Sequence, residues 1–279
     1  MYFYLMTRFI LDKSRPADFN MAADLYLLER GTGVAVRFYS WARPSITLGY
    51  MQAAGRELNL EAVRAGGAGW VRRPTGGRAI LHDGDLTYSC AFHRSLKEMG
   101  GSIAETYRLI SKCLMDGLDR ASIKCIAHDS DGGLKGIGRE VKLPCFLAPN
   151  RDEIMVSGKK LVGSAQKRTA GAVLQHGSIP ITNAFRQLPR YLRIDDAERD
   201  RQINLLIEKS CCVDELVPGA TFESLAACLM EGFSAVLPFE FEVMPWTERE
   251  EEDINNIVQS DEFITRYKSD ASMVILPAP

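Results

Sequence analysis

Cys145 and Lys160 have the side chains needed to move an acyl group through a covalent thioester. Cys145 follows a proline shortly before a predicted strand at 153–156. Lys160 opens the next predicted strand, across a tight Ser157-Gly158 turn. A neighbouring lysine favours the thiolate over the thiol, and a thiolate attacks an acyl thioester in a nearly isoenergetic exchange. The lysine charge, together with backbone N–H groups, would stabilise the tetrahedral oxyanion.

Both residues also have an ordinary structural explanation. A single cysteine in a chain of this kind usually fills space as a small buried hydrophobe. A Lys159-Lys160 pair beside a hairpin turn is usually a solvated turn. The two residues alone therefore leave covalent chemistry and plain structure both open.

A second group of candidate residues surrounds a Gly-Gly turn between two apolar segments, Trp70-Val71 and Ala79-Ile80-Leu81. Adjacent glycines can adopt positive φ and let backbone N–H groups approach a ligand closely. Such a loop could hold a carboxyl-derived or phosphorylated group, or it could be a basic hairpin turn with solvated arginines. The candidate ligand-binding residues of this loop are Arg72, Arg73, Thr75, Gly76, Gly77, Arg78 and His82, with Asp83 as a possible partner of His82.

Composition limits the class of protein. The chain has 279 residues, 46% hydrophobic and 25% charged, as expected for an ordinary globular protein. A net charge of −2 and a pI near 6.1 argue against nucleic-acid or membrane-surface binding. No apolar run reaches the roughly 18 residues of a membrane span, and the start does not resemble a signal peptide. Seven scattered cysteines without a C-x-x-C pair fit a reducing cytoplasm, and the four histidines show no metal-ligand spacing, so no cofactor or metal is expected.

The elements that must position these residues can be predicted in chain order. Asp18 resembles the N-cap of a helix whose apolar face carries Met21, Leu25 and Leu28. The segment 34–40 alternates as a half-buried strand does, and 46–50 is a short strand. Asn59 should cap a brief helix. The glycine loop should then join two strands as a hairpin, with a strand at 86–92 beside it, and further strands are expected at 153–156, 160–162 and 172–178.

Capping boxes mark two longer helices, one opened by Ser102 and Glu105 and one by Thr247 and Glu250. From about residue 190 the sequence becomes helical. We therefore predict an α+β fold, a mixed or antiparallel sheet flanked by helices with a helical C-terminal appendage. The predicted division is a catalytic domain at 1–190 and a helical extension packed on it at 191–279.

Several separated motifs together resemble the biotin/lipoate protein ligase and octanoyltransferase superfamily, from about residue 18 to 180. The motifs are Asn20-Met21-Ala22-Ala23-Asp24, Trp41-Ala42-Arg43-Pro44 with Thr47-Leu48-Gly49-Tyr50, Arg72–Ala79 with His82-Asp83, Leu86-Thr87-Tyr88-Ser89, and Gly158–Gln166. The chain most resembles the LipM-type octanoyltransferases, because Cys145-Phe146 precedes the lysine strand and Arg78 follows the two glycines. Leu174-Gln175-His176-Gly177-Ser178 also matches that subgroup.

The resemblance implies a function for these residues. Cys145 would take octanoate from octanoyl-acyl carrier protein as an enzyme thioester, and Lys160 would hold the acyl carbonyl and tune Cys145. A lysine on a lipoyl domain, that of the glycine cleavage H protein, would then accept the acyl group. Gly163, Ser164, Ala165, His176 and Gly177 complete the implied binding site. Burial of the octanoyl tail, at roughly 0.8 kcal/mol per CH₂, would position the thioester.

Other functions stay open from the sequence. An ATP-dependent lipoate ligase would not need Cys145, and an amidotransferase would move octanoate between two lipoyl domains. A non-catalytic module would only bind lipoyl domains or fatty acid. For an acidic carrier protein, Arg186, Arg190 and Arg193 are candidate surface contacts.

Overall fold

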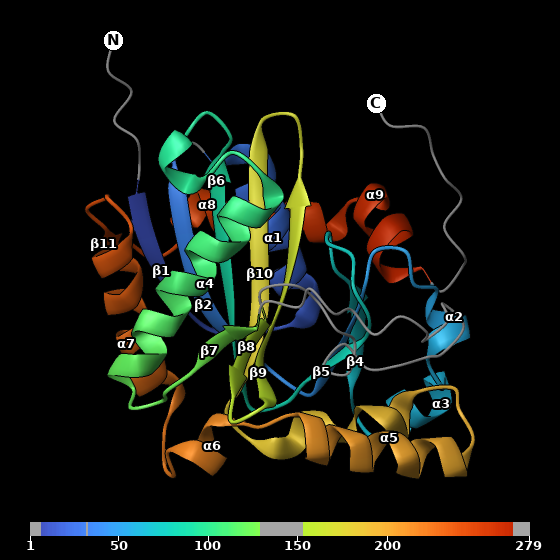
Figure 1. The fold of residues 1–279 in the computed structure, drawn as a ribbon. Helices are drawn as coiled ribbons and strands as arrows, with labels where there is room; N and C mark the ends of the chain where they lie inside the picture. Colours follow the sequence, from blue (N-terminus) through green and yellow to red (C-terminus); the bar gives the residue numbers. More distant parts are fainter. Residues whose placement is uncertain (1–6, 32, 129–152, 270–279) are drawn as a thin grey trace.

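A mixed β-sheet forms the centre of the protein, and helices cover both of its faces (Figure 1). The computed structural model describes residues 7–31, 33–128 and 153–269. Within them the large sheet has the strand order β11-β1-β2-β6-β10-β9-β8-β7. Its strands are β1 (Thr7–Arg15), β2 (Val34–Trp41), β6 (Asp85–His93), β7 (Ile126–His128), β8 (Glu153–Val156), β9 (Lys159–Arg168), β10 (Ala172–Pro180) and β11 (Glu242–Val243).

The pairing explains why this sheet is mixed. β1 runs parallel to both β2 and β11, whereas β2, β6, β10, β9, β8 and β7 pair antiparallel. The predicted β8–β9 hairpin is confirmed, and both turn residues adopt positive φ, Ser157 at 49° and Gly158 at 79°. The predicted strand at 34–40 is confirmed as β2, but the expectation that it is half-buried is wrong, because Val34–Tyr39 is buried throughout. β2 lies inside the sheet with helices on both sides, so its two faces are both covered.

The glycine loop does not form the predicted hairpin. A second, three-stranded sheet has the order β4-β3-β5, so β3 (Ser45–Leu48) lies between β4 (Gly69–Arg72) and β5 (Ile80–His82). β3 pairs parallel to β4 and antiparallel to β5. The expected pairing of the strand at 86–92 with this loop is also wrong, since β6 pairs with β2 and β10 in the large sheet. The loop therefore connects the two outer strands of the small sheet, β4 and β5, across β3.

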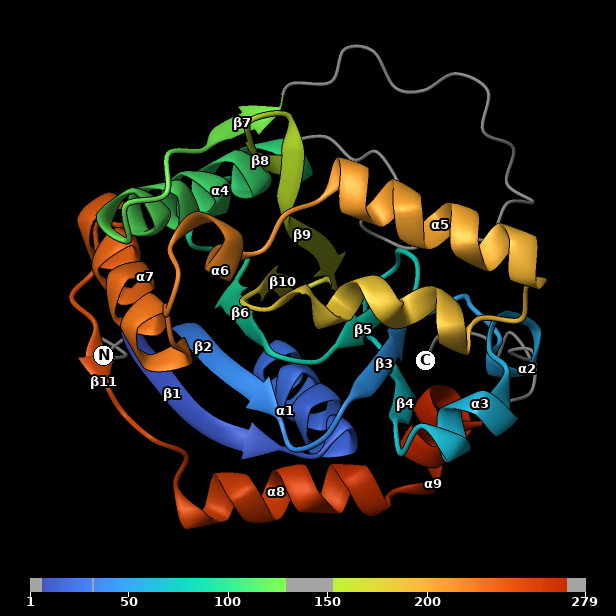
Figure 2. The same cartoon turned by 90° about the horizontal axis from the view of Figure 1, so that it is seen from below.

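One face of the large sheet packs on α1 (Ala17–Arg30) and α8 (Glu248–Gln259), which lie side by side in Figure 2. The predicted apolar residues Met21, Leu25 and Leu28 are buried there. The predicted N-cap is displaced: the helix begins at Ala17 after Pro16, and Asp18 lies in its first turn. Proline is tolerated at position 16, directly before the helix, because the N–H group that it lacks would have no hydrogen-bond partner within the helix.

The opposite face packs on α4 (Ile103–Arg120) and α7 (Phe222–Val236). Ser102 and Glu105 form the predicted capping box at the start of α4, and Thr247 and Glu250 form the one that opens α8. Both predictions are confirmed. They could be made from the sequence because each box joins residues only three positions apart.

The remaining helices are mostly short, and α5 (Asp196–Lys209) packs against one of them, η3. The short elements are α2 (Ala54–Glu57), α3 (Leu60–Ala65), η1 (Lys97–Met99), η3 (Asn183–Tyr191), α6 (Val213–Leu216), α9 (Asp261–Phe263) and η4 (Ile264–Lys268). Asn59 caps α3 as predicted. The predicted α+β fold is thus confirmed, with the expected helices present after residue 190; a domain division at that residue stays a prediction. No helix in the described part of the chain is long and apolar enough to cross a bilayer.

Candidate active site

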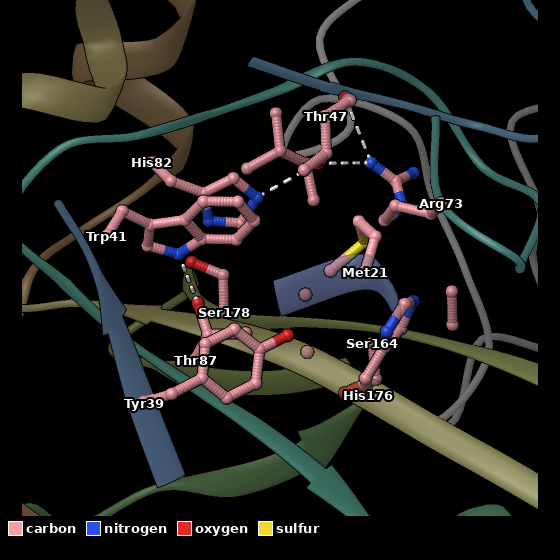
Figure 3. Close-up of a pocket in the computed structure, with 14 residues that line it drawn as sticks. Met21, Tyr39, Trp41, Thr47, Arg73, His82, Thr87, Ser164, His176 and Ser178 are labelled. Atoms are coloured by element: carbon pink, nitrogen blue, oxygen red, sulfur yellow. Dashed lines mark hydrogen bonds between the residues drawn. The ribbon is translucent and has the colours of Figure 1, made fainter. Parts of the chain in front are cut away.

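A small, partly open cavity lies between the two sheets (Figure 3). Its wall is built from α1, β2, β3, β5, β6, β9, β10 and the glycine loop. The lining residues are Met21, Tyr39, Trp41, Thr47, Arg73, Ile80, His82, Thr87, Gly163, Ser164, Ala165, His176, Gly177 and Ser178.

The structure brings together most of the predicted binding residues. The wall contains Arg73 and His82 from the glycine-loop region, Gly163–Ala165 from β9, and His176 and Gly177 from β10. Thr75 is one layer behind, with its Oγ1 2.6 Å from His176 Nε2. Gly177 has no room for a side chain, because a Cβ there would lie 2.6 Å from the Gly163 carbonyl oxygen.

A continuous hydrogen-bond chain crosses one end of the cavity. Arg73 NH1 donates to Thr47 Oγ1 over 2.7 Å, and Thr47 Oγ1 is 2.9 Å from His82 Nε2. The other ring nitrogen, His82 Nδ1, lies 2.8 Å from Asp85 Oδ2. The sequence prediction that Asp83 could orient His82 is therefore wrong. Asp85 does so, because it opens β6 and points toward the cavity side, whereas no hydrogen bond joins Asp83 to His82 in the described structure.

Asp85 also fixes the aromatic wall of this end. Its Oδ2 accepts from Thr87 Oγ1 at 2.9 Å and from Ser178 Oγ at 2.6 Å. Thr87 in turn accepts from Trp41 Nε1 at 2.8 Å, and the Trp41 ring stacks on His82 with centroids 4.1 Å apart. The residues that close this end of the cavity are thus held by one buried carboxylate and do not rely on packing alone.

A second hydrogen-bonded group supports the cavity from below. Asp24 Oδ2 on α1 lies 2.7 Å from His176 Nδ1 and accepts from the Tyr39 hydroxyl at 3.2 Å. Burial is the largest influence on His176 and lowers its pKa, although Asp24 acts in the opposite direction. His176 is therefore neutral near pH 7.

The glycine loop is held by its own arginine. Arg73 NH2 donates to the carbonyl oxygens of Gly76 and Arg78, at 3.1 and 2.9 Å. Of the two glycines only Gly77 has positive φ, 99°, whereas Gly76 is exposed in an ordinary conformation. The loop also rests on Gly49, where a Cβ would lie 2.0 Å from the Gly77 carbonyl oxygen. Arg73 is therefore a scaffold of the loop as well as part of the cavity wall.

Arg72 is among the predicted binding residues that do not line the cavity, together with Thr75, Gly76, Gly77 and Arg78. Its Nε donates to the Gln52 carbonyl, and its NH1 donates to the carbonyls of Ser269 and Arg266, at 2.6 and 3.3 Å. Arg72 thus anchors the last described turn of the chain to β4. For Arg78, the contribution to the loop that the structure shows is its carbonyl group.

Lys160 is buried on β9, before the part of that strand that lines the cavity. Its Nζ lies 2.5 Å from Glu153 Oε1 on the paired strand β8, and their side chains are 3% and 10% exposed. Gly163 follows three positions later, roughly 10 Å along an extended strand. Cys145 lies outside the described residues.

The predicted carrier-protein contact at Arg186 is wrong as a surface site. Arg186 is buried, and its guanidinium pairs with Glu215 at 2.5 Å and donates to the Ser210 carbonyl. Arg190 and Arg193 are on the surface as predicted. The sequence around Arg186 did not indicate that this side chain is buried. Phe185 and Leu188 are buried beside it in η3, a 3₁₀ helix whose side-chain period differs from that of an α-helix.

Sequence reasoning missed Asp24 and Asp85 as site residues. Asn20 and Asp24 are four positions apart, on a helix turn flanked by apolar residues, and that spacing could have indicated a buried polar face. Asp85 and Thr87 alternate along β6 and so share one face, which could have distinguished Asp85 from Asp83. In the described part of the chain no group of three or more His, Cys, Asp or Glu residues could hold a metal ion.

Comparison with known proteins gives consistent matches over most of the chain. The family described as lipoyl protein ligase A/B catalytic domain matches residues 16–234. An octanoyltransferase LipM from Kyrpidia tusciae is 37% identical over 249 residues, 87% of this chain and 91% of that protein. The octanoyltransferase LipM of Bacillus subtilis is 32% identical over 274 residues, 94% of this chain and 96% of that protein.

Solved structures with the same fold include a bipartite lipoate protein ligase with its E2 lipoyl domain from Thermoplasma acidophilum. It has a TM-score of 0.75 and 21% identity, and the match covers 93% of this chain and 96% of that one. Lipoate-protein ligase A bound with ATP has a TM-score of 0.74 and 22% identity, and the match covers 93% and 98% of the two chains. At these identities the structures show the fold alone.

Proposed function

This chain belongs to the lipoyl protein ligase A/B catalytic domain family, and from that membership we infer that it is an octanoyltransferase of lipoate biosynthesis. The observation that carries the inference is the similarity, over nearly the whole length of both chains, to proteins named octanoyltransferase LipM. The cavity between the sheets supports it, because its accessible lining is mainly apolar, as the binding of an octanoyl chain requires.

We propose that the reaction has two covalent steps. The Cys145 thiolate attacks the carbonyl carbon of octanoyl-acyl carrier protein, the carrier's C–S bond breaks, and the carrier thiolate leaves and takes up a proton. A lysine amine of a lipoyl-domain protein, such as the glycine cleavage H protein, then attacks the enzyme thioester. The amide forms, the amine loses a proton, and Cys145 is released as the leaving group.

Lys160 is proposed to supply positive charge to this reaction. Its ion pair with Glu153 holds the amine in one place on β9. An ammonium group beside a thioester carbonyl stabilises the oxyanion that develops during attack. A thiol nucleophile also fits a reducing compartment, so we place the protein in the cytoplasm.

The test is the intact mass of the protein after mixing with octanoyl-acyl carrier protein. An octanoyl adduct should form on the wild type and be absent from Cys145→Ala. Cys125→Ala is the matched control, because burial raises the pKa of Cys125 to about 11, so it stays a thiol and should not carry the adduct. A wild-type protein that forms no adduct but turns over would rule out the thioester route.

The alternative functions predict different results. An ATP-dependent lipoate ligase should show lipoate-dependent pyrophosphate exchange that survives Cys145→Ala. An amidotransferase should accept octanoyl from a lipoyl domain faster than from acyl carrier protein, so the two donors are compared side by side.

A further inference from the structure

Three buried residues from three separate elements form one hydrogen-bonded line beside the cavity. Asp24 comes from α1, His176 from β10, and Thr75 from the glycine loop. The two contacts are 2.7 Å, between Asp24 Oδ2 and His176 Nδ1, and 2.6 Å, between His176 Nε2 and Thr75 Oγ1. The exposed fractions of the three residues are 0%, 3% and 1%. In this relay, defined as Asp24–His176–Thr75, every polar group is removed from water.

The direction of each hydrogen bond in the relay is fixed by the groups that take part. A carboxylate only accepts, so the proton between Asp24 and His176 is on Nδ1. Because His176 is neutral, its Nε2 then carries a lone pair and no proton. The Thr75 hydroxyl must therefore donate to Nε2. Reversal of the ring tautomer would place the Nδ1 lone pair against the Asp24 carboxylate, two buried acceptors with no proton between them.

Asp24 is itself held on both sides. The Tyr39 hydroxyl donates to Oδ2, and Arg37 NH1 lies 3.5 Å from Oδ1. Arg37 is fully buried and fixed by Asp12 and Asn20, with NH2 at 2.8 Å from Asp12 Oδ2 and 2.6 Å from Asn20 Oδ1. The carboxylate therefore sits in a rigid frame that cannot turn away from His176 without breaking other contacts.

The other end of the relay reaches the loop that borders the cavity. The Thr75 carbonyl accepts from the Tyr50 backbone N–H at 2.8 Å, and its hydroxyl is held by His176. The next two residues, Gly76 and Gly77, form the turn, and its carbonyls are held from inside by Arg73. The hydroxyl bond to His176 is thus the link that ties the start of this turn to β10 in the large sheet.

We propose that Asp24 is a positioning residue for octanoyl transfer: it fixes the tautomer of His176 so that Thr75 is held and the Thr75–Gly77 turn keeps its place beside the acyl chain. This proposal rests on the proposed function for its link to octanoyl transfer, whereas the relay itself can be measured without any activity. None of the three residues is required to touch the reacting atoms.

Charged and titratable groups face His176 from each packed element. Asp24 on α1 raises the pKa of His176 through its hydrogen bond and charge, whereas Arg73 of the loop and His82 of β5 lower it. The Thr75 hydrogen bond to Nε2 favours the neutral ring, so its loss should raise the pKa. Removal of Asp24 and removal of the Thr75 hydroxyl should therefore shift the titration of His176 in opposite directions.

Nitrogen NMR of the protein labelled on histidine tests the relay directly, because the chain has only four histidines. His176→Gln assigns the signal, and the exposed His93 is the internal control. The wild type should show His176 with a protonated Nδ1 and an unprotonated Nε2. The midpoint of its titration should fall in Asp24→Asn, rise in Thr75→Val and stay unchanged in Thr75→Ser. A protonated Nε2 in the wild type, or equal midpoints in Thr75→Val and Thr75→Ser, overturns the relay.

The rate of acyl-adduct formation from octanoyl-acyl carrier protein tests the link to catalysis. Thr75→Val should slow it about tenfold, the value of one buried hydrogen bond, and Thr75→Ser should restore it. If Asp24→Asn does not fold, the two Thr75 variants still decide the question. A wild-type rate in Thr75→Val, together with the predicted NMR shifts, would refute positioning. Absence of both adduct and turnover in the wild type would refute the proposed function and leave the relay standing.

Discussion

Gly49→Ala should lower the rate of acyl transfer more than it lowers stability, because the backbone of Gly49 packs directly against Gly77 in the glycine loop. A Cβ at this position would lie 2.0 Å from the Gly77 carbonyl oxygen and 2.8 Å from its carbonyl carbon. Ordinary van der Waals contact begins at 3.4 Å, so the loop must move by about 3.4 − 2.0 = 1.4 Å. Both atoms belong to backbone, and no flexible side chain can absorb the difference.

The expected effects follow from that displacement. Overpacking of this kind costs roughly 1–3 kcal/mol of unfolding free energy. A misplacement of about 1 Å near a reacting group costs on the order of 100-fold in rate. Gly49→Ala should therefore remain folded while octanoyl-adduct formation falls by about 100-fold.

Adduct formation is measured by intact mass in single turnover, and stability by urea unfolding of the same samples. Gly76→Ala is the matched control in the same loop, since a Cβ there meets no atom within 4 Å and its φ is not positive. It should retain both rate and stability. Equal rates in Gly49→Ala and wild type, or an equally large loss in Gly76→Ala, would refute the view that the loop position governs acyl transfer.

Three further outcomes are expected. Glu153→Gln removes the charge beside buried Lys160, so unfolding free energy in urea should fall by about 1–3 kcal/mol and adduct formation should slow at least tenfold. Arg186→Gln should lower stability without changing the KM for acyl carrier protein. The hydrogen bond from Arg186 lowers the pKa of Glu215 in the folded protein. The ion pair therefore stabilises the fold above the unfolded-state pKa of about 4.3, and this contribution is lost as the pH falls through the lower folded-state pKa. The loss of unfolding free energy in Arg186→Gln, measured in urea, should accordingly shrink at acid pH. Trp41→Phe removes the donor to Thr87 but keeps the stack on His82, and should cost about 1 kcal/mol in thermal unfolding.

The parts of the fold that the sequence predicted depend on contacts within a few residues. Ser102 with Glu105 and the Ser157-Gly158 turn each involve groups close in the chain, so their physical cause is visible in the sequence. The apolar face of α1 was predicted for the same reason, because helical period is a local property.

The pairing of strands that are distant in the sequence was not predictable in this way. β4 and β5 flank a turn rich in glycine, which favours a hairpin, yet β3 comes between them from a segment more than twenty residues earlier. The deciding term is burial: Ile46, Leu48 and Val71 are fully buried when β3 is central. Local turn chemistry contributes less than the apolar area that such an arrangement removes from water.

The same limit applies to the candidate site: the sequence shows which residue types are present, but not which residues they bind in the folded chain. Arg73 and His82 could be recognised by their chemistry, but their partners Thr47 and Asp85 are supplied by other strands. The partners change what the residues can do. Arg73 donates to the carbonyls of its own loop and to Thr47, so it helps to shape the cavity.

Because Arg73 shapes the cavity, we propose that another residue supplies the positive charge that stabilises the oxyanion during acyl transfer. A developing oxyanion requires a donor that the fold has not already committed to its own carbonyls. We propose that Lys160 supplies this donor: its Nζ pairs with the Glu153 side chain, which holds the amine on β9. We therefore propose a division of labour in which arginine and histidine shape the acyl-binding site and lysine serves the reacting carbonyl. Under this division, loss of Arg73 should disturb the shape of the site first, and loss of Lys160 should slow the chemical step with the slot intact.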